Sequence, residues 1–265
     1  MKNRLAILGG EKTITHSFNR FNTISDEEIN AVVKVMKSGV LSSFLGSWSP
    51  EFYGGKYVKA LEKAFEKKYN VKYALAVNSW TSGLICAVGA LDIEPGDEII
   101  LTPFTMCACA SAIIHWNGIP VFVDIDEKTF NIDASLIEDH ITEKTKAIMA
   151  VDIFGHPCEI SKIMRIAKKH NLKVISDSAQ SPWSKNQDRV IGTQSDIGGY
   201  SLNYHKHIHT GEGGIIVTND QNYYQRMALI RNHAEAVVGG MGRKDLNNMI
   251  GYNFRMGEIE AAIGI

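Results

Sequence analysis

The chain has 265 residues, of which 45% are hydrophobic and 22% charged, and its 28 Lys and Arg nearly balance 29 Asp and Glu. This composition excludes a disordered chain, a collagen-like repeat and a disulfide-rich miniprotein, and the net charge of -1 offers no basic surface to nucleic acid. No apolar run reaches the ~20 residues that a membrane-spanning helix needs, and no signal peptide is visible. We therefore expect a cytoplasmic globular protein whose four cysteines are reduced thiols.

Two helices are expected before the first strand. Ser25 followed by Glu28 forms a capping box, which predicts a helix that begins directly after Ser25. A second, amphipathic helix is expected from about residue 57 to residue 69, because apolar residues recur there at helical spacing.

Short apolar segments then alternate with helical patterns, which lie at residues 83–91, 107–116 and 160–170. This alternation predicts an α/β fold with a mostly parallel seven-stranded sheet and helices on both faces. Ligands bind such sheets outside the carboxyl ends of the strands, so a site is expected in the turns that follow them. The expected strands are Tyr73–Val77, Glu98–Thr102, Pro120–Asp124, Lys146–Ile153, Lys173–Ser176, Ile197–Leu202 and Gly214–Thr218.

Small hydroxyl side chains follow the first expected strand. Ser79 and Thr81 flank Trp80 just before a helical pattern. The free N–H groups and the positive dipole end of a helix N-terminus form an anion site that suits a phosphate. Ordinary N-capping by Ser79 or Thr81 explains the same pattern, so both interpretations remain open.

Two further residues follow strands. Asp177 comes at the carboxyl end of an apolar strand, where a buried carboxylate needs a cationic or hydrogen-bonding partner. Lys206 lies between an apolar strand and the glycine-rich turn 211–214, and a desolvated lysine there can form a Schiff base with a carbonyl. A helix cap and a solvated loop lysine are the plain structural alternatives.

Six short motifs occur in order along almost the whole chain. They are Pro95–Ile99, Pro120–Asp124, Thr142–Ile148, Asp177–Gln180, Gly211–Gly214 and Asn253–Met256. Their joint order and spacing resemble those of the DegT/DnrJ/EryC-type sugar aminotransferases, which use pyridoxal 5'-phosphate (PLP) and have the aspartate-aminotransferase fold (fold type I). The resemblance implies a PLP-binding large domain and a smaller carboxy-terminal domain that is largely missing from this chain.

The resemblance also assigns roles to residues. Lys206 matches the lysine that forms the Schiff base and then moves the proton, and Asp177 matches the carboxylate that pairs with the pyridine nitrogen. Gln180 matches the residue that hydrogen-bonds the ring hydroxyl. Asn253 matches an asparagine that reaches the phosphate in the neighbouring subunit, which implies a homodimer. The expected catalytic residues are Lys206 and Asp177, and the expected cofactor-binding residues are Ser79, Trp80, Thr81, Met106, Asp177, Gln180, Ser201, Lys206 and Asn253.

Two positions depart from the family pattern. Trp80 stands where the family usually has glycine, so we expect added bulk beside the phosphate loop. Met106 stands where the family usually places an aromatic ring against the cofactor, and a thioether makes a less specific contact with a ring.

The histidines around Lys206 allow other interpretations. His205, His207 and His209 would share one face if the segment were a strand, and could then bind a metal. No carboxylate or cysteine partner accompanies them at ligand spacing, so we expect no metal; contact with substrate or cofactor is the alternative. Related PLP-dependent sugar dehydratases carry histidine at the lysine position, but counting from Ser201 and back from Gly211 places Lys206 there. A non-catalytic binding module is a further alternative, and no dinucleotide-binding glycine motif is present.

The expected reaction is transfer of an amino group from glutamate or glutamine to a keto-sugar, often nucleotide-linked. A cyclitol ketone (inosose) is the alternative acceptor. Arg231 and Arg255 are both available for the donor carboxylate. We expect an N-terminal segment at residues 1–56, a PLP-binding domain at 57–235 and a connection to a truncated carboxy-terminal domain at 236–265. Such a chain is expected to bind PLP but to turn over poorly by itself.

Overall fold

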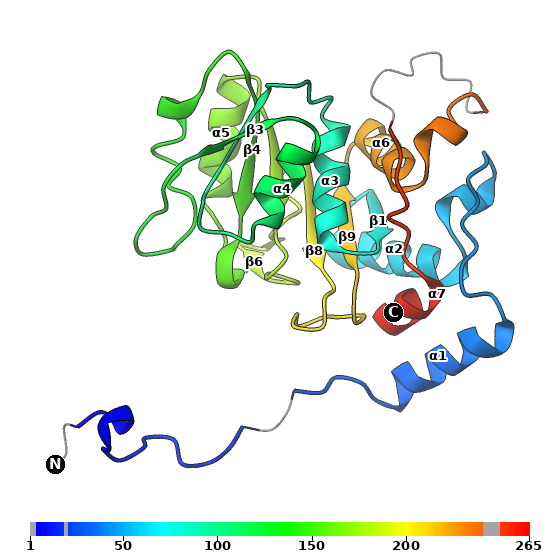
Figure 1. Cartoon of the computed structure of the whole chain (residues 1–265), viewed down its shortest axis with the longest axis horizontal. Coiled ribbons are helices and arrows are strands. Elements are labelled where there is room, and N and C mark those ends of the chain that lie inside the picture. The colour runs from blue at the N-terminus through cyan, green and yellow to red at the C-terminus, as the bar shows by residue number, and fades with distance from the viewer. Residues whose placement is uncertain (1–3, 19–20, 241–249) are drawn as a thin grey trace.

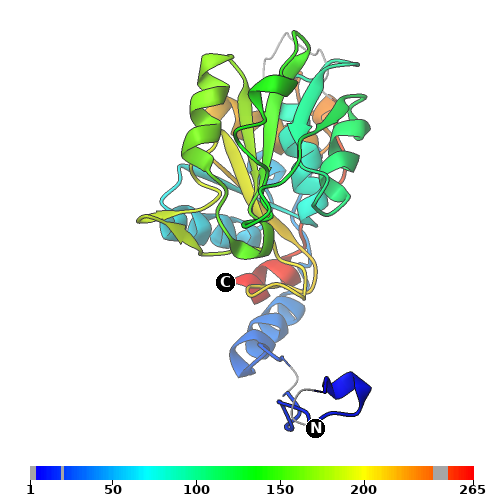
Figure 2. The ribbon, with the colours of Figure 1, turned by 90° about the vertical axis from the view of Figure 1, so that its left-hand side faces the viewer.

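A computed structural model describes residues 4–18, 21–240 and 250–265. A seven-stranded sheet lies at its centre, and helices cover both faces of the sheet (Figures 1 and 2). All seven predicted strands belong to this sheet, with ends within two residues of the predicted ones. They are β1 (Tyr73–Val77), β2 (Glu98–Leu101), β3 (Ile119–Phe122), β4 (Thr145–Val151), β5 (Lys173–Asp177), β8 (Ile197–Ser201) and β9 (Gly214–Thr218).

The strand order is β1-β9-β8-β5-β4-β2-β3. The strands from β8 to β3 pair in parallel, and β9 runs antiparallel to both β8 and β1. The predicted mostly parallel sheet is confirmed. Because β1, β5 and β8 point the same way, the residues that follow Val77, Asp177 and Ser201 meet at one edge of the sheet.

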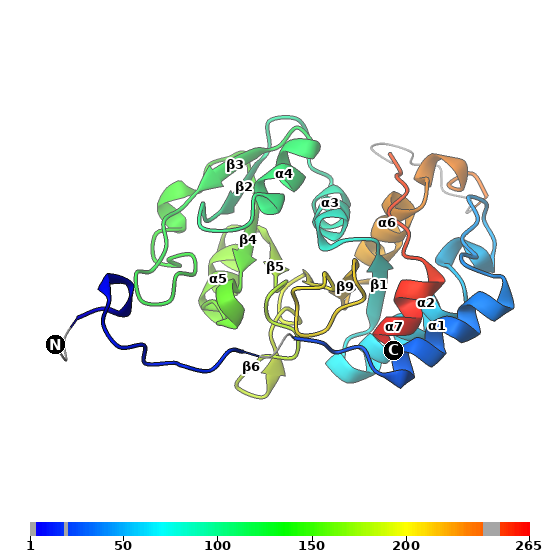
Figure 3. The ribbon, with the colours of Figure 1, turned by 60° about the horizontal axis from the view of Figure 1, so that its bottom comes forward.

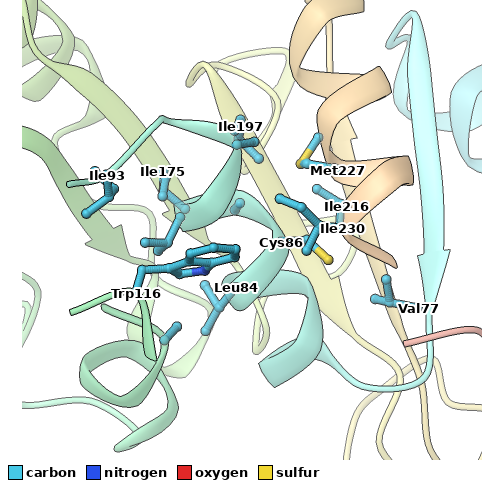
Figure 4. Close-up of a cluster of buried hydrophobic side chains, with 14 of the residues drawn as sticks. Val77, Leu84, Cys86, Ile93, Trp116, Ile175, Ile197, Ile216, Met227 and Ile230 are labelled. Carbon is cyan, nitrogen blue, oxygen red and sulfur yellow. The ribbon is translucent and has the colours of Figure 1, made fainter. Parts of the chain in front are cut away.

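Three helices cover one face of the sheet: α3 (Trp80–Ala90), α4 (Ala108–His115) and α6 (Gln221–Arg231). Their apolar sides pack with inward-facing strand residues in the largest hydrophobic cluster of the described residues. Figure 4 shows part of it, where Leu84 and Ile175 lie on either side of the Trp116 ring. This packing fixes the N-terminus of α3 against the sheet edge where the strands end.

The opposite face carries α2 (Lys56–Tyr69) over the β1, β9 and β8 strands and α5 (Ile160–Lys169) over β4 and β5. Successive residues of β4 explain why both faces are covered. Ala147 and Met149 belong to the cluster under α3 and α4, whereas Ile148 and Ala150 belong to the cluster under α5. A strand buried on both sides is typical of a parallel sheet between two helix layers.

Helix α1 (Asp26–Ser38) packs on α7 (Glu258–Gly264), and the segment before α1 extends away from the sheet (Figures 1 and 3). The predicted capping box is present, since Ser25 Oγ accepts from Glu27 N–H and Glu28 accepts from Ser25 N–H at 2.6 Å. No helix among the described residues is long and apolar enough to cross a membrane.

Several elements differ from the sequence expectations. Helix α3 begins at Trp80 rather than at Gly83, and α6 was not predicted, although Asp220 caps it by accepting from Asn222 N–H at 2.7 Å. A small hairpin of β6 (Lys185–Asn186) and β7 (Arg189–Val190) was also missed. The remaining short elements are the 3-10 turns Ala6–Leu8, Pro50–Tyr53, Glu138–His140, Ile153–Gly155 and Ala234–Ala236.

Candidate active site

A cavity of about 380 Å³ opens at the edge of the sheet where β1, β4, β5 and β8 end. Eight of the nine predicted cofactor-binding residues line it. They are Ser79, Trp80, Thr81, Met106, Asp177, Gln180, Ser201 and Lys206. The ninth, Asn253, is exposed and is not among the lining residues. The fold therefore gathers residues from four separate parts of the chain around one space.

The N-terminus of α3 forms one end of the cavity. Ser79 is the N-cap and its Oγ accepts from Ser82 N–H at 3.1 Å, while Gly83 N–H donates to Ser79 O. The N–H groups of Trp80 and Thr81 precede these bonds and have no partner within the helix. Capping and anion binding are thus compatible here, because the cap occupies Ser82 and leaves the two preceding donors for a ligand.

Asp177 lies at the last position of β5 and is 5% exposed. Its Oδ1 accepts from Trp80 Nε1 at 2.7 Å and from Ala179 N–H at 3.0 Å, and its Oδ2 accepts from Cys109 Sγ at 3.0 Å. A buried carboxylate requires such donors. Burial and the neighbouring Asp177 charge raise the pKa of Cys109 well above its ordinary value, so this thiol stays a donor.

The place of the Trp80 side chain corrects a sequence expectation. Its ring is buried and reaches Asp177, instead of adding bulk beside the phosphate loop. Two glycines provide the space: a Cβ on Gly83 would lie 2.6 Å from the indole, and one on Gly199 would lie 2.0 Å from it.

Gln180 faces the same cavity beside Asp177. Its Oε1 accepts from Phe154 N–H at 2.6 Å, which leaves the amide nitrogen to donate to a ligand. Met106 also lines the cavity, with 70% of its surface exposed. A flexible thioether at this rim can contact a flat ligand without a fixed ring-to-ring geometry.

Lys206 lies on the loop that joins β8 to β9. Backbone bonds hold this loop closed: Leu202 N–H donates to Gly213 O, and Tyr204 N–H donates to Gly211 O at 2.8 Å. Lys206 N–H itself donates to Asn203 O. These backbone bonds hold the half-buried Lys206 at the lining of the cavity that Asp177 also lines.

The three histidines around Lys206 do not share a strand face, because the segment is an irregular loop. His205 lines the cavity and its ring lies 3.8 Å from that of Tyr204, whereas His209 Nε2 bonds Thr23 Oγ1 at 2.6 Å. Within residues 4–18, 21–240 and 250–265, no group of three or more His, Cys, Asp or Glu side chains could hold a metal ion.

Neither arginine considered for the donor carboxylate lines the cavity. Arg231 is fully buried, and its Nη1 donates to Glu62 Oε1 at 2.8 Å. Arg255 Nε donates to Asn253 Oδ1 at 2.7 Å. Arg231 is therefore a structural residue, and Arg255 lies with Asn253 outside the lining of the cavity.

Sequence reasoning missed several residues of the site. Asp152 directly follows β4, the same signal that identified Asp177, and it accepts from Ser178 Oγ and from Cys158 N–H. Burial raises the pKa of Asp152 despite these bonds. The other missed lining residues include Thr105, Asn203 and Glu212, whereas His205, considered for contact with substrate or cofactor, is among the lining residues. Cys109 was not predictable, because its partner Asp177 is 68 positions away.

Comparison with known proteins places the chain in one family. Residues 22–265 match the profile of the DegT/DnrJ/EryC1/StrS aminotransferase family. The GDP-perosamine synthase of Escherichia coli O157:H7 is 41% identical over 211 residues, which cover 80% of this chain and 57% of that protein. The chain thus spans little more than half the length of this relative.

Solved structures show the same relationship. The aminotransferase from Psychrobacter cryohalolentis superposes with a TM-score of 0.83 at 33% identity, covering 94% of this chain and 62% of that one. The E. coli GDP-4-keto-6-deoxy-D-mannose-3-dehydratase, solved with bound hydrated PLP, gives 0.80 at 28% identity over 92% and 65% of the two chains. The chain belongs to the DegT/DnrJ/EryC1/StrS aminotransferase family, and solved structures similar to it hold PLP or its amino form, PMP.

Proposed function

We propose that this protein is a PLP-dependent aminotransferase that moves an amino group from glutamate or glutamine to a keto-sugar. One observation carries the proposal: Lys206 and Asp177 line the same cavity as the free N–H groups at the start of α3. PLP needs three kinds of partner: an amine, a carboxylate and N–H donors for its phosphate. Lys206, Asp177 and the start of α3 offer all three.

The residues of the cavity fit PLP by their chemistry. The Trp80 and Thr81 N–H groups and the Ser201 hydroxyl suit a phosphate, and the Asp177 carboxylate suits a protonated pyridine nitrogen. The free amide nitrogen of Gln180 suits the ring oxygen. When bound, PLP supplies an electron sink for the bonds at the carbon that carries the amino group.

The side chains of this chain would act in sequence on the bound PLP and the substrate. The Lys206 Nζ would hold the cofactor until the amino donor displaces it. The freed Nζ would then move a proton between the substrate carbon and the cofactor carbon that the shared nitrogen joins, as a general base and acid. Asp177 would keep the ring nitrogen protonated, and Met106 would contact the ring. His205 also lines the cavity, so its ring would be available to the substrate.

A nucleotide-linked keto-sugar is the proposed acceptor, because the similarity to GDP-perosamine synthase extends over 80% of the length of this chain. A cyclitol ketone remains the alternative acceptor. Dehydration is the alternative reaction, because a sugar dehydratase is also a structural neighbour. Transamination is favoured because Lys206, not a histidine, takes the lysine position.

The reaction can be tested in two halves on the PLP-loaded protein. Glutamate or glutamine should bleach the visible absorption band, and a GDP-linked 4-keto-sugar or an inosose should restore it with release of an amino product. Mass spectrometry distinguishes an amino sugar from a deoxy-keto-sugar. If neither glutamate nor glutamine bleaches the band, the transaminase proposal is contradicted. A deoxy-keto-sugar product would favour the dehydratase.

We further propose a cytoplasmic homodimer in which Asn253 serves the neighbouring site. The support is that Asn253 is exposed and lies outside the lining of the cavity, although it belongs to the family motif Asn253–Met256. Placed outside the cavity of its own chain, Asn253 would serve the phosphate site of a neighbouring subunit.

A further inference from the structure

The Trp80 indole links the phosphate end of the cavity to the carboxylate end. Trp80 is the first residue of α3, and its Nε1 donates to Asp177 Oδ1, a residue 97 positions later. The bond is short, at 2.7 Å, and both side chains are 5% exposed. A buried hydrogen bond to a carboxylate is stronger than one between neutral groups, so this contact has more than a packing role.

The hydrogen bonds to Asp177 fill its two oxygens unequally. An ionised carboxylate offers roughly two acceptor positions on each oxygen. Oδ1 accepts from Trp80 Nε1 and from Ala179 N–H, so both of its positions are taken. Oδ2 accepts from Cys109 Sγ alone among the described donors, so one position on Oδ2 is left for a ligand.

The surroundings of the indole hold it in this place. A Cβ on Gly83 would lie 2.6 Å from Trp80 Cε3, and one on Gly199 would lie 2.0 Å from Cζ3. Helix α3, which contains Gly83, and strand β8, which contains Gly199, thus both lack a side chain where the ring passes between them. The ring has little room to turn away from Asp177, which is the condition for a fixed orientation of the carboxylate.

We propose that Trp80 is a positioning residue: together with Ala179 N–H it saturates Oδ1 of Asp177, so that Oδ2 presents its remaining acceptor position to the pyridine nitrogen of PLP. This inference rests on the proposed function, because it assigns the pairing of Asp177 with that nitrogen. Trp80 itself does not touch the reacting atoms in this account.

The first test is Trp80→Phe, which removes the indole N–H and keeps an aromatic ring. Trp116→Phe is the matched control, because Trp116 is also a core tryptophan (Figure 4) but donates to the backbone oxygen of Ile85 at 2.8 Å. With PLP labelled with nitrogen-15 at the ring, we expect Trp80→Phe to move the bound resonance toward the neutral pyridine value. We also expect the Kd for PLP to rise roughly three- to tenfold, as for a weakened charge-assisted hydrogen bond. Trp116→Phe should change neither.

A second pair of variants keeps the proposal testable if Trp80→Phe does not fold. Gly83→Ala adds a methyl group against the Trp80 ring, and Gly89→Ala, on the same helix, adds one 2.3 Å from the Trp116 ring. Gly83→Ala should shift the nitrogen-15 resonance in the same direction as Trp80→Phe, and Gly89→Ala should not. An unchanged resonance and Kd in folded Trp80→Phe or Gly83→Ala would overturn the inference. If the unmodified protein bound no PLP, the proposed function itself would fail, which is a different outcome.

Discussion

At the scale of single residues, a buried ion pair joins α2 and α6 at β1, the strand that leads into the site. Arg231 is fully buried. Its Nη1 donates both to Glu62 Oε1 and to Ala76 O, which lies on β1, the strand that leads to the turn at Ser79. Burial raises the pKa of Glu62, and the Arg231 charge opposes that effect. The arginine therefore keeps a buried carboxylate compensated and fixes β1 at the same time.

Arg231→Leu should lower the free energy of unfolding by about 3–5 kcal/mol, because it leaves Glu62 buried without its charge partner. Lys169→Ala is the control: the Lys169–Glu138 pair is exposed and solvent-screened, so its loss should change the free energy of unfolding far less than Arg231→Leu does. Urea unfolding followed by circular dichroism measures both. The added change Glu62→Leu should recover part of the loss in Arg231→Leu. Equal costs for Arg231→Leu and Lys169→Ala would contradict this account.

At the scale of elements, local sequence patterns predicted the helices and strands that depend mainly on local interactions. The seven sheet strands followed from apolar runs, and α1 followed from the capping box at Ser25 and Glu28. Helix α6 was missed although Asp220 caps it, because its sequence mixes tyrosine and polar residues without a clear apolar face. The β6–β7 hairpin was missed because two-residue strands leave no periodic pattern to detect.

The cap of α1 gives a prediction at this scale. Ser25→Ala removes the acceptor for Glu27 N–H and should destabilise the helix by about 0.5–2 kcal/mol. Faster hydrogen exchange confined to the amides of residues 26–30 is the expected result. The control is Ser17→Ala, because Ser17 is exposed and lies outside any helix. Unchanged exchange in α1 of the Ser25→Ala variant would show that tertiary packing, not the cap, holds its start.

At the scale of the whole molecule, the sheet topology brings together what the sequence keeps apart. The sequence predicted eight lining residues of the cavity because each follows a strand or matches a family motif. It could not predict the bonds of Trp80 and Cys109 to Asp177, which depend on the packing of α3 and α4 against β5. The antiparallel direction of β9 was also not predicted, although the absence of a helix between β8 and β9 permits it.

The proposed dimer gives a prediction at the same scale. Lys206→Ala and Asn253→Ala should each bind PLP more weakly than the unmodified protein. Mixed and allowed to exchange subunits, the two variants should recover one intact site per mixed dimer, because each supplies the residue that the other lacks. Light scattering measures the subunit number, and PLP titration of the mixture measures the recovered sites. A monomer, or a mixture that binds no better than its parts, would contradict the shared site.

The central claim is that Lys206 holds PLP beside Asp177, and visible absorbance tests it most directly. The purified protein with added PLP should show the absorption band of a lysine-bound cofactor, and Lys206→Ala should lose that band. Lys185→Ala, which alters an exposed lysine on β6, should keep it. A band that persists in the Lys206→Ala variant would contradict the account.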